Sequence, residues 1–176
     1  MPNHLRSIGS AVLCSGLAAT LGACAGADIS TGSIAPYEAA NSFYPYGYQD
    51  TAVAENQHRV TASGSGRASK ARLEKIALTR AAEIGVDKKK PFFKVGTVTH
   101  GVVCSKKTAA THKGRESPES NRPTVTLDVT YSDTASDPGF RDTKASLAEY
   151  KTVMEADTGS AEASQLDELK AQCGGA

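Results

Sequence analysis

Large aliphatic and phenylalanine side chains are scarce in this chain, and their shortage limits how much of it can fold around a core. Leu, Ile, Val and Phe supply 30 of the 176 residues, about 17%, below the roughly 20% at which a compact core becomes doubtful. Six of the 30 lie in residues 1–23. If that stretch is a leader, 24 remain for 153 residues, which is enough for one small domain with long segments outside its core. This composition argues against a large enzyme fold with a deep cleft.

The N-terminal segment has the layout of a secretory signal. Arg6 and the amino terminus supply positive charge, and residues 8–21 follow without a charged side chain, as in a basic n-region and an apolar h-region. The Leu-Gly-Ala-Cys sequence at residues 21–24 then resembles the bacterial lipobox, whose Cys thiol carries a diacylglyceryl group. We expect residues 1–23 to be a lipoprotein signal peptide that is cleaved before Cys24. The alternative is an ordinary secretory signal, with Cys24 as an unmodified thiol.

Two cysteines remain for the folded part of the chain. Of the four cysteines, Cys14 leaves with the leader and Cys24 is lipidated. Cys104 and Cys173 are then an even pair in an oxidising compartment, and we predict a disulfide that closes a loop of about 70 residues. The alternatives are two free thiols or a metal pair in which His100 joins Cys104. Because no second cluster of ligands accompanies that pair, we predict no metal site.

The chain after the leader is predicted to contain a tether and one domain. Residues 24–48 show neither helical nor strand periodicity, and we predict a lipidated Cys followed by a flexible tether. A Tyr-Pro-Tyr-Gly-Tyr run at residues 44–48 has two interpretations: docking against the domain, which we prefer, or contact with lipid headgroups. The folded domain is predicted to span residues 49–176.

Hydrophobic spacing predicts a small α+β domain with the element order β-α-β-β-α. The predicted elements are a strand at 58–62, a Gly-Ser-Gly turn at 64–66, a helix that Ser69 caps and Gly85 ends, a long strand at 92–103, an alternating strand at 125–131, a turn at 137–139 and helices at 143–156 and 163–172. This order implies a helix packed on one face of a short mixed or antiparallel sheet. A bond between Cys104 and Cys173 would pin the last helix onto that sheet.

Four short segments between residues 46 and 95 form a pattern. They are Tyr46-Gly47-Tyr48, Asn56-Gln57-His58-Arg59-Val60, Leu78-Thr79-Arg80-Ala81-Ala82-Glu83 and Phe92-Phe93-Lys94-Val95. The pattern resembles small proteobacterial lipoproteins of unknown function, although Thr79 stands where that family usually has Leu, and Gly66-Arg67 where it often has Gly-Asn. The resemblance supports the envelope location and the α+β fold. It implies no activity, because none is assigned to the family.

Two sets of charged residues are candidates for contacts. Arg80 and Glu83 lie three apart on the predicted helix, and because Arg80 also falls on the apolar stripe, it is a candidate anchor to the sheet or to a partner. Residues 87–115 hold eight Lys or Arg against one acid, whereas residues 144–176 hold three against six. The candidate anion-binding residues are Lys88, Lys89, Lys90, Lys94, Lys106 and Lys107. They would contact anionic lipid, lipopolysaccharide or peptidoglycan acids, and the simpler interpretation is a set of solvated loops.

Catalytic and cofactor motifs are not recognised in the sequence. The Gly64-Ser65-Gly66 turn precedes a helix, but Ser69 stands where the dinucleotide fingerprint needs Gly or Ala. None of the four histidines accompanies a nucleophile motif. We therefore predict no catalytic residue and no cofactor.

These observations favour a non-enzymatic binding or structural lipoprotein of the bacterial envelope. Its expected partners are the bilayer, through acylated Cys24, and an envelope protein, peptidoglycan or anionic lipid, but not nucleic acid. Ala25, rather than Asp, follows Cys24, which in the enterobacterial sorting rule implies the outer membrane, facing the periplasm. The first alternative is a disulfide-containing stress sensor, and a weaker one is an enzyme with a shallow site.

Overall fold

The computed structural model describes residues 35–104, 121–157 and 165–174. The elements in chain order are β1 (Gly47–Ala54), β2 (Gln57–Ser63), α1 (Lys70–Asp87), β3 (Phe92–Val103), β4 (Arg122–Ser132), β5 (Arg141–Asp142), α2 (Thr143–Ala156) and α3 (Gln165–Gly174). The five strands form one sheet in which every neighbouring pair is antiparallel. The predicted α+β class is therefore confirmed. The predicted signal peptide and Cys24 lie outside the described residues.

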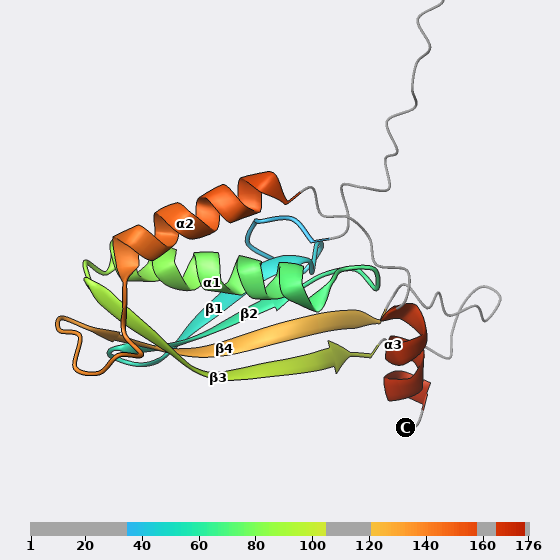
Figure 1. Cartoon of the computed structure of the whole chain (residues 1–176). Coiled ribbons are helices and arrows are strands. Elements are labelled where there is room, and N and C mark those ends of the chain that lie inside the picture. The colour runs from blue at the N-terminus through green and yellow to red at the C-terminus, as the bar shows by residue number, and fades with distance from the viewer. Residues whose placement is uncertain (1–34, 105–120, 158–164, 175–176) are drawn as a thin grey trace, which may run out of the picture.

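The strand order is β1-β2-β4-β3-β5, so the long β4 lies at the centre of the sheet. Figure 1 shows α1 and α2 on the same side of the sheet, and α3 beyond the end of β3. In the part of the chain that the structure describes, no helix covers the opposite face. That face carries polar pairs across β2 and β4: Thr61 with Thr126 (Oγ1 to Oγ1, 3.0 Å) and Arg59 with Asp128 (Nε to Oδ1, 2.8 Å).

The hydrophobic core lies between α1 and the covered face of the sheet. Buried residues alternate along β2 and β4 and recur at three- and four-residue steps along α1, as the sequence spacing predicts. They include Val60, Ala62, Leu73, Ile76, Ala77, Ala81, Ile84, Phe93, Val125, Leu127, Val129 and Tyr131. The Tyr131 hydroxyl also donates a hydrogen bond to the carbonyl of Ala81 (2.7 Å), which joins the central strand to the helix.

Helix α1 begins where the sequence predicts, but it ends later. The Ser69 hydroxyl accepts a hydrogen bond from the backbone N–H of Arg72 (3.0 Å), so the predicted N-cap is confirmed. The prediction that Gly85 ends the helix is wrong, because Gly85 lies inside α1. A Cβ at this position would lie 2.6 Å from Cγ2 of Thr143. Gly85 therefore allows the start of α2 to pack closely against α1.

The C-terminus of α1 closes without a glycine. Lys88 is the C-cap, and Lys89 takes the left-handed conformation with φ 57°. The N–H of Lys90 donates to the carbonyl of Gly85 (2.8 Å), and the N–H of Lys89 donates to the carbonyl of Val86 (3.0 Å). This pair of bonds is the Schellman arrangement, in which glycine usually occupies the left-handed position.

The predicted strand at 92–103 and the helix at 143–156 have the bounds of β3 and α2, and the alternating strand at 125–131 lies within β4. The predicted C-terminal helix overlaps α3. In the predicted turn, the Asp137 side chain accepts a hydrogen bond from the N–H of Gly139 (2.8 Å). None of the described helices has both the length and the hydropathy that a membrane span requires.

The predicted start of the domain at residue 49 is too late. Strand β1 forms one edge of the sheet, so two strands precede α1 rather than one. Earlier still, Ala35 is only 3% exposed, and the ring of Tyr37 lies 5.1 Å from that of Tyr48. Sequence periodicity missed β1 because its covered side presents Tyr48 and Asp50, not an apolar repeat. The preferred interpretation of the tyrosine run is borne out at Tyr48, which packs against the core.

Candidate functional site

The middle of α1 carries polar side chains that reach across to β1. We call Tyr48, Asp50, Arg80 and Glu83 the Arg80 cluster. The Nε of Arg80 donates to Oδ1 of Asp50 (2.8 Å), and its Nη1 donates to Oε2 of Glu83 (3.3 Å). The guanidinium carbon lies 5.0 Å from the centre of the Tyr48 ring, within cation–π range. The structure therefore brings the predicted pair together, and Arg80 anchors α1 to the edge strand.

The Arg80 cluster is partly shielded from water. The side chains of Arg80, Asp50 and Glu83 are 22%, 25% and 20% exposed. Lys151 of α2 also approaches Glu83, with its Nζ 3.6 Å from Oε1 of that carboxylate. Because two carboxylates and a ring already surround Arg80, its charge is compensated and the guanidinium is not an open receptor for an anionic ligand. The arrangement holds α1, α2 and β1 together.

His58 lies beside this cluster, on the covered side of β2. It is 6% exposed, and its ring packs edge-on against Tyr131 with centres 5.7 Å apart. Neither ring nitrogen has a hydrogen-bond partner among the described residues, although Nδ1 lies 4.0 Å from Oδ2 of Asp50. Burial lowers the pKa of His58 below its ordinary 6.5, the positive charges of Lys88 and Arg80 lower it further, and Asp50 opposes them. The folded protein therefore favours neutral His58.

This environment makes stability depend on pH. Because the pKa of His58 is lower in the folded state, the unfolded chain binds more protons below about pH 6.5, and the free energy of unfolding is expected to fall as pH drops from 7.5 to 5.5. Urea unfolding at a series of pH values measures the slope. His58→Phe should flatten this slope. Equal slopes in wild type and His58→Phe would contradict this assignment.

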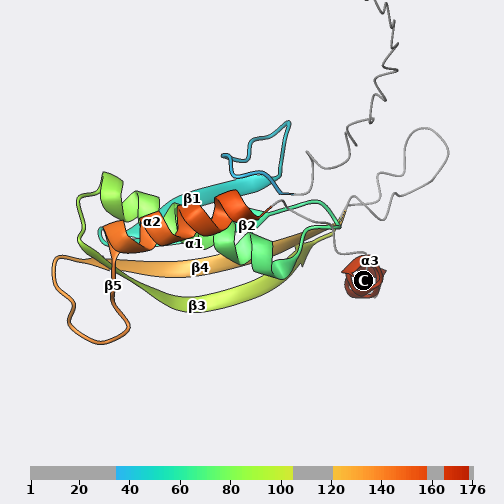
Figure 2. The ribbon, with the colours of Figure 1, turned by 45° about the horizontal axis from the view of Figure 1, so that its top comes forward.

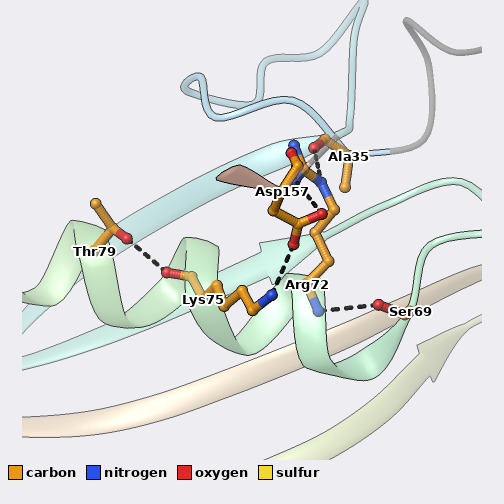
Figure 3. Close-up of polar contacts among 6 residues, drawn as sticks. All are labelled: Ala35, Ser69, Arg72, Lys75, Thr79 and Asp157. Atoms are coloured by element: carbon orange, nitrogen blue, oxygen red, sulfur yellow. Dashed lines mark hydrogen bonds and ion pairs between the residues drawn. The ribbon is translucent and has the colours of Figure 1, made fainter. Parts of the chain in front are cut away.

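A second polar network lies near the start of α1. We call Ala35, Arg72, Lys75 and Asp157 the Arg72 clamp. The Nε of Arg72 donates to the carbonyl of Ala35 (2.9 Å), its Nη1 donates to the carbonyl of Asp157 (3.1 Å), and the Nζ of Lys75 donates to Oδ2 of Asp157 (2.9 Å). Figure 3 shows Arg72 and Lys75 reaching from α1 toward Asp157, with Ala35 beside them. The clamp therefore ties the segment that begins at Ala35 and the end of α2 to the same helix.

Two of the four candidate anion-binding lysines that the structure describes are paired with carboxylates. The Nζ of Lys90 lies 2.9 Å from Oδ2 of Asp133, and that of Lys94 lies 2.9 Å from Oδ2 of Asp137. These two charges are balanced by local carboxylates. Lys88 and Lys89 are exposed at the turn after α1.

Two of the candidate lysines, Lys106 and Lys107, lie outside the described residues. Anion binding by Lys88, Lys89 and this pair stays a prediction.

Cys104 and Cys173 are joined by a disulfide, with Cα atoms 5.5 Å apart. It connects the end of β3 to α3, and Cys104 is therefore not a thiolate ligand beside His100. Two further contacts hold α3: Leu169 is 3% exposed, and Glu168 accepts a hydrogen bond from Lys70 (2.8 Å).

A cavity of about 40 Å³ lies between α3 and the ends of β3 and β4. Its lining includes Lys70, His100, Pro123, Glu168 and Leu169. A cavity of this size accommodates a few water molecules, whereas small-molecule sites usually measure hundreds of Å³.

Nothing in the described part of the chain gathers three His, Cys, Asp or Glu side chains where they could hold a metal ion. Asp50, Ala35 and Asp157 are not predictable from the sequence, because each lies far along the chain from its partner on α1 and belongs to no motif. Comparison with protein-family models, curated proteins and solved structures finds no match. The resemblance to small proteobacterial lipoproteins stays a prediction.

Proposed function

We propose that this chain is a lipid-anchored protein of the bacterial envelope whose domain has a non-enzymatic binding or structural role. The cysteine pattern carries the proposal. Cys24 is the last residue of a lipobox-like sequence and directly follows the predicted leader, and Cys104 and Cys173 are bonded to each other. Disulfides persist in the oxidising compartments outside the cytoplasm, so the bond supports the same location as the leader. The proposed location is the outer membrane, with the domain in the periplasm.

The start of the domain supports a position close to the bilayer. The Arg72 clamp holds Ala35 on α1, so only residues 25–34 separate the first described residue from Cys24. A segment of that length spans at most about 35 Å when fully extended. The domain would therefore remain close to the membrane surface. A tether that extends to residue 48 would allow a larger distance between the domain and the bilayer.

A binding or structural role agrees with how the polar side chains are used. The Arg80 cluster and the Arg72 clamp join elements of the fold to one another. The described cavity of about 40 Å³ is small for a substrate. The proposed partner of the domain is an envelope protein, peptidoglycan or anionic lipid.

Cell fractionation tests the anchor. Cys24→Ser is expected to move the protein from the membrane fraction to the soluble periplasmic fraction and to abolish labelling by radioactive palmitate. Cys14→Ser, a cysteine substitution within the leader, is the matched control and should leave both unchanged. The proposal fails if Cys24→Ser remains in the membrane fraction to the same extent as the wild type.

A second candidate function is redox or envelope-stress sensing. It is favoured by the exposure of Cys104 and by the place of the disulfide, which links a terminal helix to the end of a strand. A sensor would need this bond for its signal, so a variant with both cysteines replaced by Ser should alter an envelope-stress response while remaining folded. An unchanged response in that folded variant would eliminate this candidate.

A further inference from the structure

The segment between Ala35 and β1 forms a loop with an aromatic tip. Phe43 at this tip is 97% exposed, more than any other large hydrophobic residue in the described part of the chain. Tyr44 and Tyr46 follow it in the chain, with their rings edge-to-face and 5.2 Å apart. Figure 2 shows this blue loop projecting away from the sheet and from the helices. Single exposed hydrophobic side chains are common on protein surfaces. The exposure of Phe43 is therefore significant only together with the hydrogen bonds that hold it at the tip of the loop.

Hydrogen bonds define the conformation of the tip. The Asn41 side-chain oxygen accepts from the N–H of Phe43 (2.9 Å) and from that of Tyr44 (2.8 Å). The N–H of Asn41 donates to the carbonyl of Tyr44 (2.9 Å), which closes the turn. The Ser63 hydroxyl of β2 donates to the carbonyl of Pro45. This bond holds the part of the loop that leads into β1. Phe43 is therefore displayed on a turn that is already formed.

The base of the loop is fixed on the domain. The N–H of Tyr48 donates to the carbonyl of Glu38 (2.8 Å), and the N–H of Ala40 donates to the carbonyl of Tyr48 (2.8 Å). Gly47 has φ 109°, and a Cβ there would overlap the carbonyl oxygen of Glu38. Glycine is therefore required at position 47, where the chain passes close to the backbone of Glu38. The loop therefore has a rigid stem, and its aromatic tip has a set direction.

The tip of the loop carries no charge, and the nearest charged residue of the segment is Glu38 at its base. Residues 39–49 contain no Asp, Glu, Lys, Arg or His, so the tip can enter a region of low polarity without the cost of moving a charged group out of water. Phenylalanine inserts below lipid headgroups, and tyrosine prefers the interface, where its hydroxyl remains hydrated. This composition fits a lipid surface better than a polar glycan.

We infer that the Phe43 loop, residues 41–46, is a membrane-contact site that inserts Phe43 into the interface of the bilayer. The inference rests on the proposed function, because Cys24 would hold Ala35 and the loop that follows it close to the lipid. The loop supplies a second contact beside the acyl anchor. It orients the domain, so that the side bearing the loop faces the membrane.

The chain contains no tryptophan, which allows a single reporter to be placed at the tip. The lipidated protein carrying Phe43→Trp is reconstituted into vesicles of phosphatidylethanolamine and phosphatidylglycerol, with and without brominated acyl chains. Blue-shifted emission and quenching by the brominated lipid are expected. Val53→Trp is the matched control, since Val53 is 55% exposed at the end of β1, and its emission should remain that of an indole in water.

A second measurement separates this inference from the anchor itself. The mature chain from residue 24, made with Cys24→Ser, has neither the leader nor an acyl group. Adding Phe43→Ser should weaken its partition onto the same vesicles about tenfold or more. Phe43 is exposed in the folded protein, so the variant should keep the wild-type thermal unfolding. Protein that does not float with vesicles contradicts the proposed anchor. Protein that floats while the indole at position 43 stays unquenched, or equal partition with and without Phe43→Ser, overturns the membrane-contact site.

Discussion

Replacing both Cys104 and Cys173 with Ser is expected to lower the free energy of unfolding by about 4 kcal/mol. The two cysteines are 69 residues apart in the sequence, and cross-linking so long a loop removes a large part of the conformational freedom of the unfolded chain. The effect is large for a domain of this size, whose total stability is on the order of 5–15 kcal/mol. Urea unfolding monitored by circular dichroism measures the loss.

The position of the bond adds a local consequence. Besides the disulfide, α3 is held by buried Leu169 and by the pair of Lys70 with Glu168, whose side chains are each 47% exposed. An ion pair exposed to this extent contributes less than about 1 kcal/mol. We therefore expect α3 to detach in the double variant before the sheet unfolds, with early loss of amide protection in this helix. Cys24→Ser is the matched control, and a double variant as stable as this control would contradict the prediction.

Arg80→Met is expected to lower the free energy of unfolding by about 2 kcal/mol. The substitution keeps most of the apolar stem but leaves Asp50 and Glu83 without their shared partner. Removing one member of a fully buried ion pair costs about 3–5 kcal/mol, and the 20% to 25% exposure of these carboxylates reduces that cost. Loss of the cation–π contact with Tyr48 acts in the same direction.

Arg59→Met is the matched control for the Arg80 cluster. Arg59 and Asp128 also pair at 2.8 Å, but their side chains are 55% and 46% exposed on the open face of the sheet. We expect this variant to lose much less stability than Arg80→Met, because solvent screens an exposed pair. A double-mutant cycle with Arg80→Met and Asp50→Asn isolates the coupling between α1 and β1. Equal losses for Arg80→Met and Arg59→Met would show that burial does not strengthen the Arg80 cluster.

The sequence predicted those elements whose signals are local. Ser69 supplies an N-cap hydroxyl directly before an apolar stripe, and its role is confirmed. The strand at 92–103 and the helix at 143–156 have the predicted bounds, because turns or breakers delimit them. The alternation through Val125, Leu127 and Val129 places three core residues on one face of the central strand.

The remaining features depend on contacts between distant parts of the chain. Strand β1 has no apolar repeat because Asp50, on its covered side, pairs with Arg80 of α1. Glycine commonly ends a helix, but Gly85 lies inside α1, where its small size permits the close approach of Thr143. Ala35 gives no signal at all, since a small residue in a stretch without periodicity becomes part of the core only through the Arg72 clamp. Such pairings require the three-dimensional arrangement.

The intact mass of the mature protein, purified from membranes of a proteobacterial host, tests most directly the claim that this is a lipid-anchored envelope protein. We predict a chain that begins at Cys24, carries the mass of a diacylglyceryl group with or without an additional acyl chain, and is two hydrogens lighter because Cys104 and Cys173 are joined. A mature chain that begins at another residue, or that begins at Cys24 without a lipid, would contradict the account.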